Sequence, residues 1–249
     1  MNEKKRLRLD TALLDRGLVE SRSRAKALVM AGAVKVNGKL VTKAGTYVRE
    51  GDELDLNISS NPFVGRGGLK LQHALDHFRI SVKNRICIDV GASTGGFTDC
   101  LLQHGACHVI AVDVGYGQLD WKLRNHEQVT NMERTNIRNL TRKELPCIPE
   151  FGTVDVSFIS LRKVLPVLLP LMTEQPELVV LIKPQFEAGP KNIGKGGIVR
   201  DPKVREMVVK DLKGFFSDEL MLKISGITES PIKGAKGNVE FLCHLSGRR

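Results

Sequence analysis

The sequence has few aromatic residues and no long apolar run. Aromatic side chains make up 5% of the 249 residues, too few for a broad surface on which nucleic-acid bases stack. The longest apolar stretch, residues 164–172, is interrupted by Pro166 and Pro170 and is far shorter than the roughly 20 residues that cross a bilayer. The N-terminus begins with charged residues and shows no apolar signal segment. We therefore expect a cytoplasmic protein without a membrane span.

Cysteine and histidine are also sparse, and their spacing does not suggest a metal site. The five cysteines never form a C-x-x-C pair and lie mostly in apolar runs, as reduced core thiols of a cytosolic protein do. His73 and His77 are four residues apart, as are His104 and His108, but Gly105 interrupts the second pair. With no acid and third ligand nearby in sequence, we expect no bound metal.

Positive charge is in excess. The chain contains 38 lysines and arginines against 28 acidic residues, a formal net charge of +10. Such an excess indicates an anionic partner, with nucleic acid favoured over membrane.

The first 56 residues differ from the rest. Apolar residues at helical spacing predict two short helices, within residues 9–17 and 21–32, each ending at a glycine. Asn37-Gly38 between alternating apolar residues predicts a hairpin with a type I′ turn, and residues 48–56 predict a further strand. Residues 57–64 are polar and contain Pro62, which predicts a linker. The chain is thus divided into domains at 1–56 and 65–249.

Basic residues crowd the first domain and predict a surface for RNA phosphates, although a solvated helix face is the plainer alternative. The expected RNA contacts are Arg6, Arg8, Arg22, Arg24, Lys26, Lys35 and Lys39. Arg8-Leu-Asp, Ser21-Arg-Ser-Arg-Ala-Lys26 and the turn into the hairpin resemble the small RNA-binding module of ribosomal protein S4, the alpha-L motif. That resemblance covers residues 6–56 and implies binding of structured RNA.

The second domain alternates apolar runs with helical stretches. Runs near residues 86–90, 108–114, 153–158 and 177–182 predict a mostly parallel sheet covered on both faces. Two later runs, 220–227 and 239–245, predict an antiparallel closing hairpin. The expected fold class is α/β, a Rossmann-like sheet of the kind found in methyltransferases that use S-adenosylmethionine (SAM).

A glycine-rich loop, Asp89-Val-Gly-Ala-Ser-Thr-Gly-Gly-Phe97, follows the first of these runs. Phe97 stands where a phosphate-binding P-loop has lysine, and the glycine spacing does not fit the dinucleotide fingerprint. A nucleoside cofactor without phosphate remains, and SAM fits, with Asp113 at the next strand end to accept the ribose hydroxyls. A plain turn is the alternative. The residues expected at the cofactor are Asp89, Gly91, Ser93, Gly95, Gly96, Phe97, Asp113 and Asn136.

Four charged residues stand in apolar surroundings at or near strand ends or the glycine loop: Lys70, Asp155, Lys183 and Glu240. Buried charges are costly unless paired, so we expect a network suited to methyl transfer to a hydroxyl. Lys183 is the expected base, with Lys70 as its electrostatic neighbour. Asp155 would align the amine and the target sugar, and Glu240 would orient them. Taken singly, each residue also fits a salt bridge at a strand end.

This order of residues resembles the Lys-Asp-Lys-Glu tetrad of the FtsJ-type ribose 2′-O-methyltransferases. With Gly65-Arg-Gly-Gly-Leu-Lys70, Asp113-Val-Gly-Tyr-Gly-Gln-Leu119 and Lys183-Pro-Gln-Phe-Glu187, nearly the whole chain resembles the TlyA family, also named haemolysin A. The resemblance implies 2′-O-methylation of cytidine in ribosomal RNA or ribosomal subunits, with SAM as donor. Asn136 departs from the FtsJ pattern, in which an acidic residue contacts the adenine ring of SAM. An amide can still accept a hydrogen bond there.

A second glycine-rich loop, residues 189–197, follows the expected base. It either closes over RNA, with Lys191, Lys195 and Arg200 near phosphates, or is a plain flexible loop. Two other functions stay open at this stage: a membrane-active haemolysin, and a ribosome-binding factor without catalysis.

Overall fold

The computed structural model describes residues 6–19, 21–30, 32–56, 61–194 and 196–248. Internal contacts divide the chain into two compact units, Met1–Arg66 and Gly67–Arg249. Residues 57–60 of the expected linker lie outside the described residues, as does Lys195, so the linker stays a prediction.

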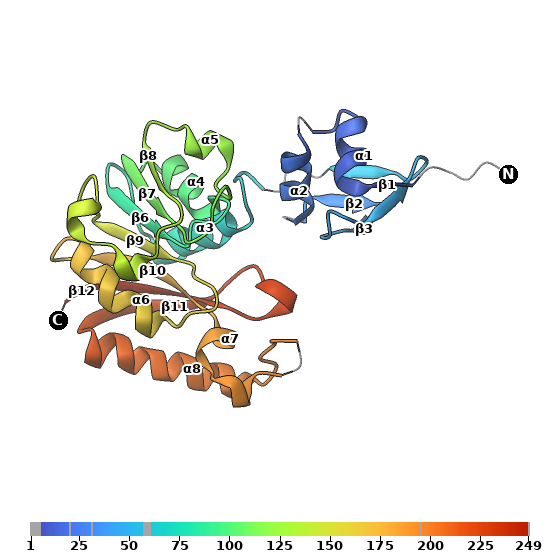
Figure 1. The fold of residues 1–249 in the computed structure, drawn as a ribbon. Helices are drawn as coiled ribbons and strands as arrows, with labels where there is room; N and C mark the ends of the chain where they lie inside the picture. The colour runs from blue at the N-terminus through green and yellow to red at the C-terminus, as the bar shows by residue number, and fades with distance from the viewer. Residues whose placement is uncertain (1–5, 20, 31, 57–60, 195, 249) are drawn as a thin grey trace. The chain divides into compact units, whose positions relative to one another are not determined.

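The N-terminal unit packs two short helices on short strands (Figure 1). Its elements are β1 (Arg6–Arg8), α1 (Leu9–Asp15), α2 (Arg22–Met30), β2 (Val34–Val36), β3 (Lys39–Leu40), β4 (Tyr47–Arg49) and β5 (Leu54–Leu56). Leu9, Leu13 and Val29 are fully buried in its core. Asn37 and Gly38 both have positive φ, 50° and 74°, which confirms the predicted type I′ hairpin between β2 and β3.

The single strand predicted over residues 48–56 is wrong, because the chain turns in its middle. β4 pairs with β1, whereas β5 pairs with β2 in a different sheet. The Asp52 carboxylate accepts the Arg49 amide at 2.7 Å and closes the turn. Arg16, which directly follows α1, donates to the carbonyl oxygens of residues 49, 50 and 52. These contacts outweigh the alternating pattern that suggested one strand.

The C-terminal unit is built on a mixed sheet. Its strands are β6 (Ile86–Val90), β7 (His108–Val112), β8 (Val129–Met132), β9 (Phe151–Val154), β10 (Glu177–Ile182), β11 (Leu222–Glu229) and β12 (Phe241–Arg248). Its α-helices are α3 (Gly67–Phe78), α4 (Gly96–Gln103), α5 (Trp121–Arg124), α6 (Leu161–Leu168), α7 (Pro184–Glu187) and α8 (Pro202–Gly214). Short helical turns are η2 (Ile137–Asn139), η3 (Arg142–Glu144), η4 (Leu169–Leu171), η5 (Pro190–Asn192), η6 (Phe215–Glu219) and η7 (Ala235–Gly237).

The described strands of this unit form one seven-stranded sheet in the order β11-β12-β10-β9-β6-β7-β8. The five strands from β10 to β8 run parallel, and β12 is antiparallel to both of its neighbours. This arrangement confirms the α/β class, the parallel runs and the closing hairpin. β8 was not predicted, and β9 ends at Val154, which leaves residues 155–158 in a loop.

Alternation along the strands sorts side chains between two helical layers. Ile88, Val90 and Val154 share one core cluster with Leu165 of α6 and Leu212 of α8. Because successive residues of a strand point to opposite faces, the odd-numbered residues of β6 point away from that cluster. Helices α3 and α4 pack against each other there, and α4 contacts β6 and β7. The sheet is thus covered on both faces (Figure 1).

Candidate active site

A cavity of about 1040 Å³ lies at the carboxyl ends of the central strands. The chain runs outward from β6 through β7 and β8 and then returns to β9 on the other side of β6. Such a reversal of strand order is where α/β sheets bind ligands. The cavity is lined by residues that follow β6, β7, β8, β9 and β10, among them Gly91, Ser93, Asp113, Asn136, Asp155, Phe158, Gln185 and Phe186.

The glycine loop forms one wall of the cavity, and its conformation requires glycine. Gly91 has φ +88°, and a Cβ there would lie 2.5 Å from the backbone oxygen of Asp155. Gly95, with φ +94°, caps the start of α4. A side chain at Gly91 would push the loop away from the end of β9, so glycine keeps the two cavity walls close.

Asp113 joins two loops at the cavity edge. Its Oδ2 accepts the Ser93 amide at 2.8 Å, and its Oδ1 accepts the Gly115 amide at 2.6 Å. A carboxylate has lone pairs for further donors, so Asp113 could still receive the ribose hydroxyls of a nucleoside. The Asn136 side chain accepts the Arg138 amide at its Oδ1, at 3.1 Å, and so caps the start of η2.

The other expected cofactor residues lie behind this wall. Asp89 is fully buried, and its carboxylate accepts the hydroxyls of Thr98 at 2.7 Å and Thr153 at 2.9 Å. Burial outweighs these bonds and raises the pKa of Asp89 to about 6. Phe97 is buried and packs near Gly67 of α3, while Gly95 and Gly96 shape the turn. None of these four is among the residues that line the cavity.

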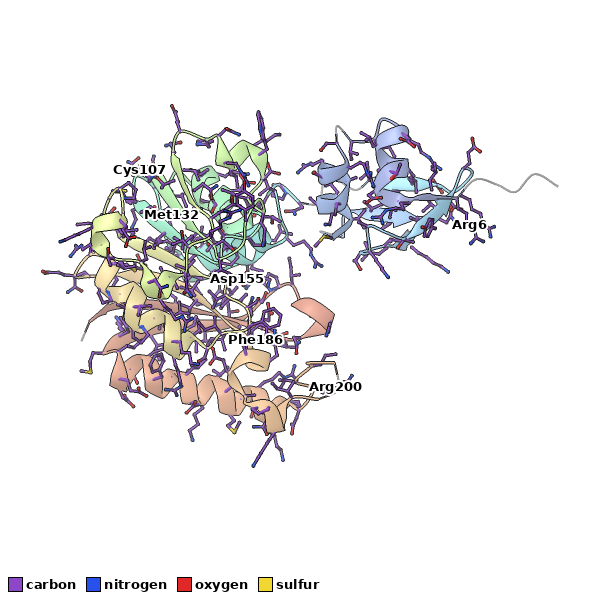
Figure 2. All side chains as sticks on the ribbon, in the orientation of Figure 1. Arg6, Cys107, Met132, Asp155, Phe186 and Arg200 are labelled. Carbon is purple, nitrogen blue, oxygen red and sulfur yellow. The ribbon has the colours of Figure 1, made fainter. Side chains whose placement is uncertain are left out.

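The predicted base lies beside the predicted aligning acid. Lys183 immediately follows β10, and its Nζ lies 2.6 Å from Asp155 Oδ1, just beyond β9. The same Nζ donates to Ser157 Oγ at 3.0 Å. The Lys183 side chain is 10% exposed and the Asp155 side chain 21%, so the pair borders the cavity with little access to water. Asp155 and Phe186 are labelled in Figure 2.

The remaining two charged residues form a second ion pair. Lys70 of α3 and Glu240, just before β12, approach to 2.6 Å, with side chains 11% and 2% exposed. Gln185 donates its Nε2 to the other oxygen of Glu240 at 3.1 Å. Because Gln185 follows Lys183 by two residues in the chain, it connects the two pairs. A Cβ at Gly234 would overlap the Glu240 carboxylate, so glycine makes room for this acid.

Sequence reasoning missed Ser157, Gln185 and Phe158. Phe158 is 91% exposed at the cavity edge, has φ +63°, and its ring lies 5.0 Å from that of Phe186. Hydrophobic patterning assigns a phenylalanine to the core and gives no signal for an exposed one. Only its position after Asp155, beyond the strand end, could have indicated a role.

A half-buried carboxylate contacts the loop that carries Phe158. Glu187 of α7 accepts the Ser160 hydroxyl at 2.6 Å and the Leu161 amide at 2.8 Å, at the start of α6. Burial raises the pKa of Glu187 despite these bonds. The loop between β9 and α6 is therefore fastened to the segment that carries Lys183 and Gln185.

The predicted RNA contacts lie on several elements of the N-terminal unit. Arg6 and Arg8 are on β1, Arg22, Arg24 and Lys26 on α2, Lys35 on β2 and Lys39 on β3. Arg24 and Lys35 are half-buried, and the other five are exposed. Arg8 donates twice to the buried Asp10 carboxylate, at 3.0 and 2.8 Å, and Arg22 lies 3.9 Å from it. Asp10 thus orients one predicted contact and lies near a second.

The second glycine-rich loop contacts the turn before Glu240. Asn238 donates to the carbonyl oxygen of Gly197 at 3.0 Å and accepts the Val199 amide at 3.0 Å. Lys236 donates to the carbonyl oxygen of Gly196 at 2.9 Å. These bonds fasten one end of the loop, while its closing over RNA stays a prediction.

The histidine pairs are separated or stacked. His104 follows α4 and His108 begins β7, as the intervening glycine predicted, and the His73 and His77 rings stack at 5.6 Å. Among the residues that the structure covers, no cluster of three potential ligands is placed to hold a metal. None of the helices in the described ranges is both long and apolar enough to cross a membrane.

Comparison with known proteins agrees with this geometry. Residues 63–246 match the FtsJ-like methyltransferase family, and residues 7–54 match the S4 domain. YqxC of Bacillus subtilis is 51% identical over 97% of this chain and 86% of its own length. The 16S/23S rRNA (cytidine-2′-O)-methyltransferase TlyA of Mycobacterium tuberculosis is 43% identical, over 97% of this chain and 90% of its own.

A solved structure shows the same likeness along nearly the whole chain. It is described as a hemolysin from Streptococcus thermophilus, is 44% identical, and covers 98% of this chain and 89% of its own with a TM-score of 0.78. Two domain matches in the order expected, and relatives similar over almost their full length, lead to one assignment. The chain belongs to the TlyA, or hemolysin A, family of FtsJ-like methyltransferases that carry an N-terminal S4 domain.

Proposed function

We propose that this protein transfers a methyl group from SAM to the ribose 2′-hydroxyl of a cytidine in ribosomal RNA. The observation that supports this most is the pairing of Lys183 with Asp155, which lines the cavity, and of Lys70 with Glu240, which the cavity residue Gln185 contacts. In this proposal residues 1–56 bind RNA, residues 57–64 link, and residues 65–249 catalyse. A ribosomal substrate implies that the protein works in the cytoplasm.

Asp113, Asn136 and the wall of Gly91 and Ser93 would hold the donor. SAM supplies a methyl group already activated on a sulfonium, so the protein's task is to align a hydroxyl and remove its proton. Lys183, after losing its proton to water, would accept the hydroxyl proton as the new C–O bond forms and the methyl–sulfur bond of SAM breaks, which releases S-adenosylhomocysteine. Ser157 holds the Lys183 nitrogen in place at 3.0 Å. Lys70 and Glu240 form the second ion pair, and Gln185 connects it to the cavity.

An exposed aromatic ring supports a nucleotide substrate. Phe158 exposes 91% of its surface next to the cavity and is tethered through the Glu187 contacts to the loop behind it. Stacking of one base on one aromatic ring contributes about 1–3 kcal/mol. In our proposal the target base stacks on Phe158 while its ribose enters the cavity, although the chain as a whole is poor in aromatics.

The N-terminal unit would bring the RNA to the site. Its exposed arginines and lysines suit phosphate contacts, which position a nucleic acid without reading its sequence. Asp10 restricts the Arg8 guanidinium by two hydrogen bonds, and a fixed donor loses less entropy on binding phosphate.

Methyl transfer can be measured with labelled SAM and unmodified 16S and 23S rRNA transcripts or subunits. We expect the wild type to label RNA and Lys183→Ala to bind RNA without labelling it. Lys143 in η3 is exposed and does not line the cavity, so Lys143→Ala serves as the matched control. Mapping of 2′-O-methyl marks would then identify the nucleotide.

The two remaining functions have distinct outcomes in the same assay. A wild type that binds rRNA but transfers no methyl group to transcripts or subunits would contradict the enzyme and support a ribosome-binding factor. Lysis of liposomes by the purified protein would instead support a membrane-active haemolysin. No feature of the described residues favours either function over methyl transfer.

A further inference from the structure

Gln185 lines the cavity and carries a buried acceptor, Oε1, that has no hydrogen-bond donor among the described residues. Three buried side-chain atoms of the described residues lack a hydrogen bond: His73 Nε2, Asp155 Oδ1 and Gln185 Oε1. Asp155 Oδ1 forms an ion pair with Lys183 Nζ at 2.6 Å, and His73 does not line the cavity. Gln185 lines it and is 7% exposed, and its Oε1 has no hydrogen-bond donor among the described residues.

The orientation of the Gln185 amide is set by its neighbour. Nε2 lies 3.1 Å from Glu240 Oε1 and donates to it. Turning the amide over would place two oxygens at that distance, one of them on a carboxylate, which is repulsive. The Glu240 carboxylate cannot rotate away, because its Oε2 accepts a hydrogen bond from Lys70 Nζ at 2.6 Å. Oε1 therefore points away from this ion pair as an acceptor without a donor.

A buried acceptor without a donor costs about 1–3 kcal/mol. We propose that Gln185 Oε1 accepts a hydrogen bond from an N–H or O–H group of a substrate bound in the cavity. The same side chain holds Glu240 through Nε2, so Gln185 couples substrate binding to the Lys70–Glu240 pair. A donor that binds at Oε1 would offset this cost. This inference rests on the proposed function for the identity of the substrates.

Two sources can supply such a donor. One is the amino-acid ammonium of SAM, and the other is a hydroxyl or amino group of the RNA nucleotide. Both are hydrogen-bond donors of the right class, and a binding experiment distinguishes them. Binding is measured without turnover, so that a change in the rate of transfer does not enter the comparison.

Gln185→Met removes the acceptor at similar side-chain length. With full-length protein, calorimetry would measure the affinity for S-adenosylhomocysteine and for 5′-methylthioadenosine, which lacks the amino-acid part. Filter binding would measure affinity for unmodified 16S and 23S rRNA transcripts. Urea unfolding would test the fold of the variant, and Gln103→Met, at an exposed position of α4, is the control.

We expect one affinity to fall by about fivefold to 150-fold, the range that about 1–3 kcal/mol implies, with Gln103→Met unchanged. A loss confined to S-adenosylhomocysteine, with 5′-methylthioadenosine unaffected, assigns the donor to the ammonium. A loss confined to RNA assigns it to the nucleotide. Both affinities within twofold of wild type, in a variant that unfolds cooperatively, would overturn the proposal. A wild type that binds S-adenosylhomocysteine but methylates no RNA refutes the proposed function and leaves this ligand test intact.

Discussion

Asp89 offers a direct test of whether the first acid of the glycine loop binds the cofactor or supports the fold. Its carboxyl is fully buried, and burial raises its pKa from the ordinary value of 3.8 to about 6 in the folded state. The raised pKa means that the fold favours the neutral form. The stabilisation from neutral Asp89 is complete below about pH 3.8 and is lost as the pH rises through about 6.

The expected size follows from the two pKa values. A difference of about two units at 1.36 kcal/mol per unit corresponds to about 3 kcal/mol. Asp89→Asn cannot ionise, and its amide can still bond the hydroxyls of Thr98 and Thr153. Relative to wild type, the free energy of unfolding of Asp89→Asn should rise by about 3 kcal/mol between pH 4 and pH 7 and stay level above that.

Urea unfolding of both proteins at a series of pH values measures this difference. Asp76→Asn, at an exposed position of α3, controls for the loss of one negative charge. The affinity of Asp89→Asn for S-adenosylhomocysteine at pH 7.5 should stay within about twofold of wild type, because both carboxylate oxygens are engaged inside the fold. A stability difference that does not change with pH, or a loss of ligand affinity in a folded variant, would refute this account of Asp89.

Three further changes test the site. Lys70→Met leaves Glu240 as an uncompensated buried charge and should lower the free energy of unfolding by about 3–5 kcal/mol; adding Glu240→Leu should restore much of that stability in urea, but no methyl transfer. Gly91→Ala should destabilise by clearly more than Gly117→Ala, since both have positive φ but only the former meets backbone; equal losses would contradict the steric argument. Phe158→Ala should reduce kcat/KM for RNA about tenfold or more with ligand affinity and thermal midpoint unchanged, whereas Phe158→Trp should retain activity.

The parallel strands could be predicted because both their faces are buried. β6, β7 and β10 consist of nearly continuous apolar residues, the pattern of strands between two helical layers. β8 was not predicted because it is an edge strand. Val129–Met132 pairs only with β7 among the described strands and is half-buried throughout. A strand that buries only part of its side chains does not need a continuous apolar sequence.

The meeting of the four charged residues was predictable for a related reason. Asp155 and Lys183 follow parallel strands, so they lie at the same edge of the sheet, and Glu240 precedes an antiparallel strand whose first residue is at that edge. The choice of partners was not predictable, because it depends on side-chain reach across 170 residues between Lys70 and Glu240. Gln185 was missed for the same reason, as an uncharged residue gives no sign of burial at a site.

The pairing also determines how the tetrad should be tested. Two lysines and two carboxylates cancel in charge, and burial is tolerable only while each charge keeps its partner. Replacing Lys183 alone leaves Asp155 without its cation, so lost activity could reflect a disturbed loop rather than a missing base. Removing Lys70 should destabilise the fold more than removing Lys183, because the Glu240 side chain is only 2% exposed and almost no water can take the place of Lys70. Variants that remove both members of a pair keep the balance of charge and separate the chemistry of the site from its stability.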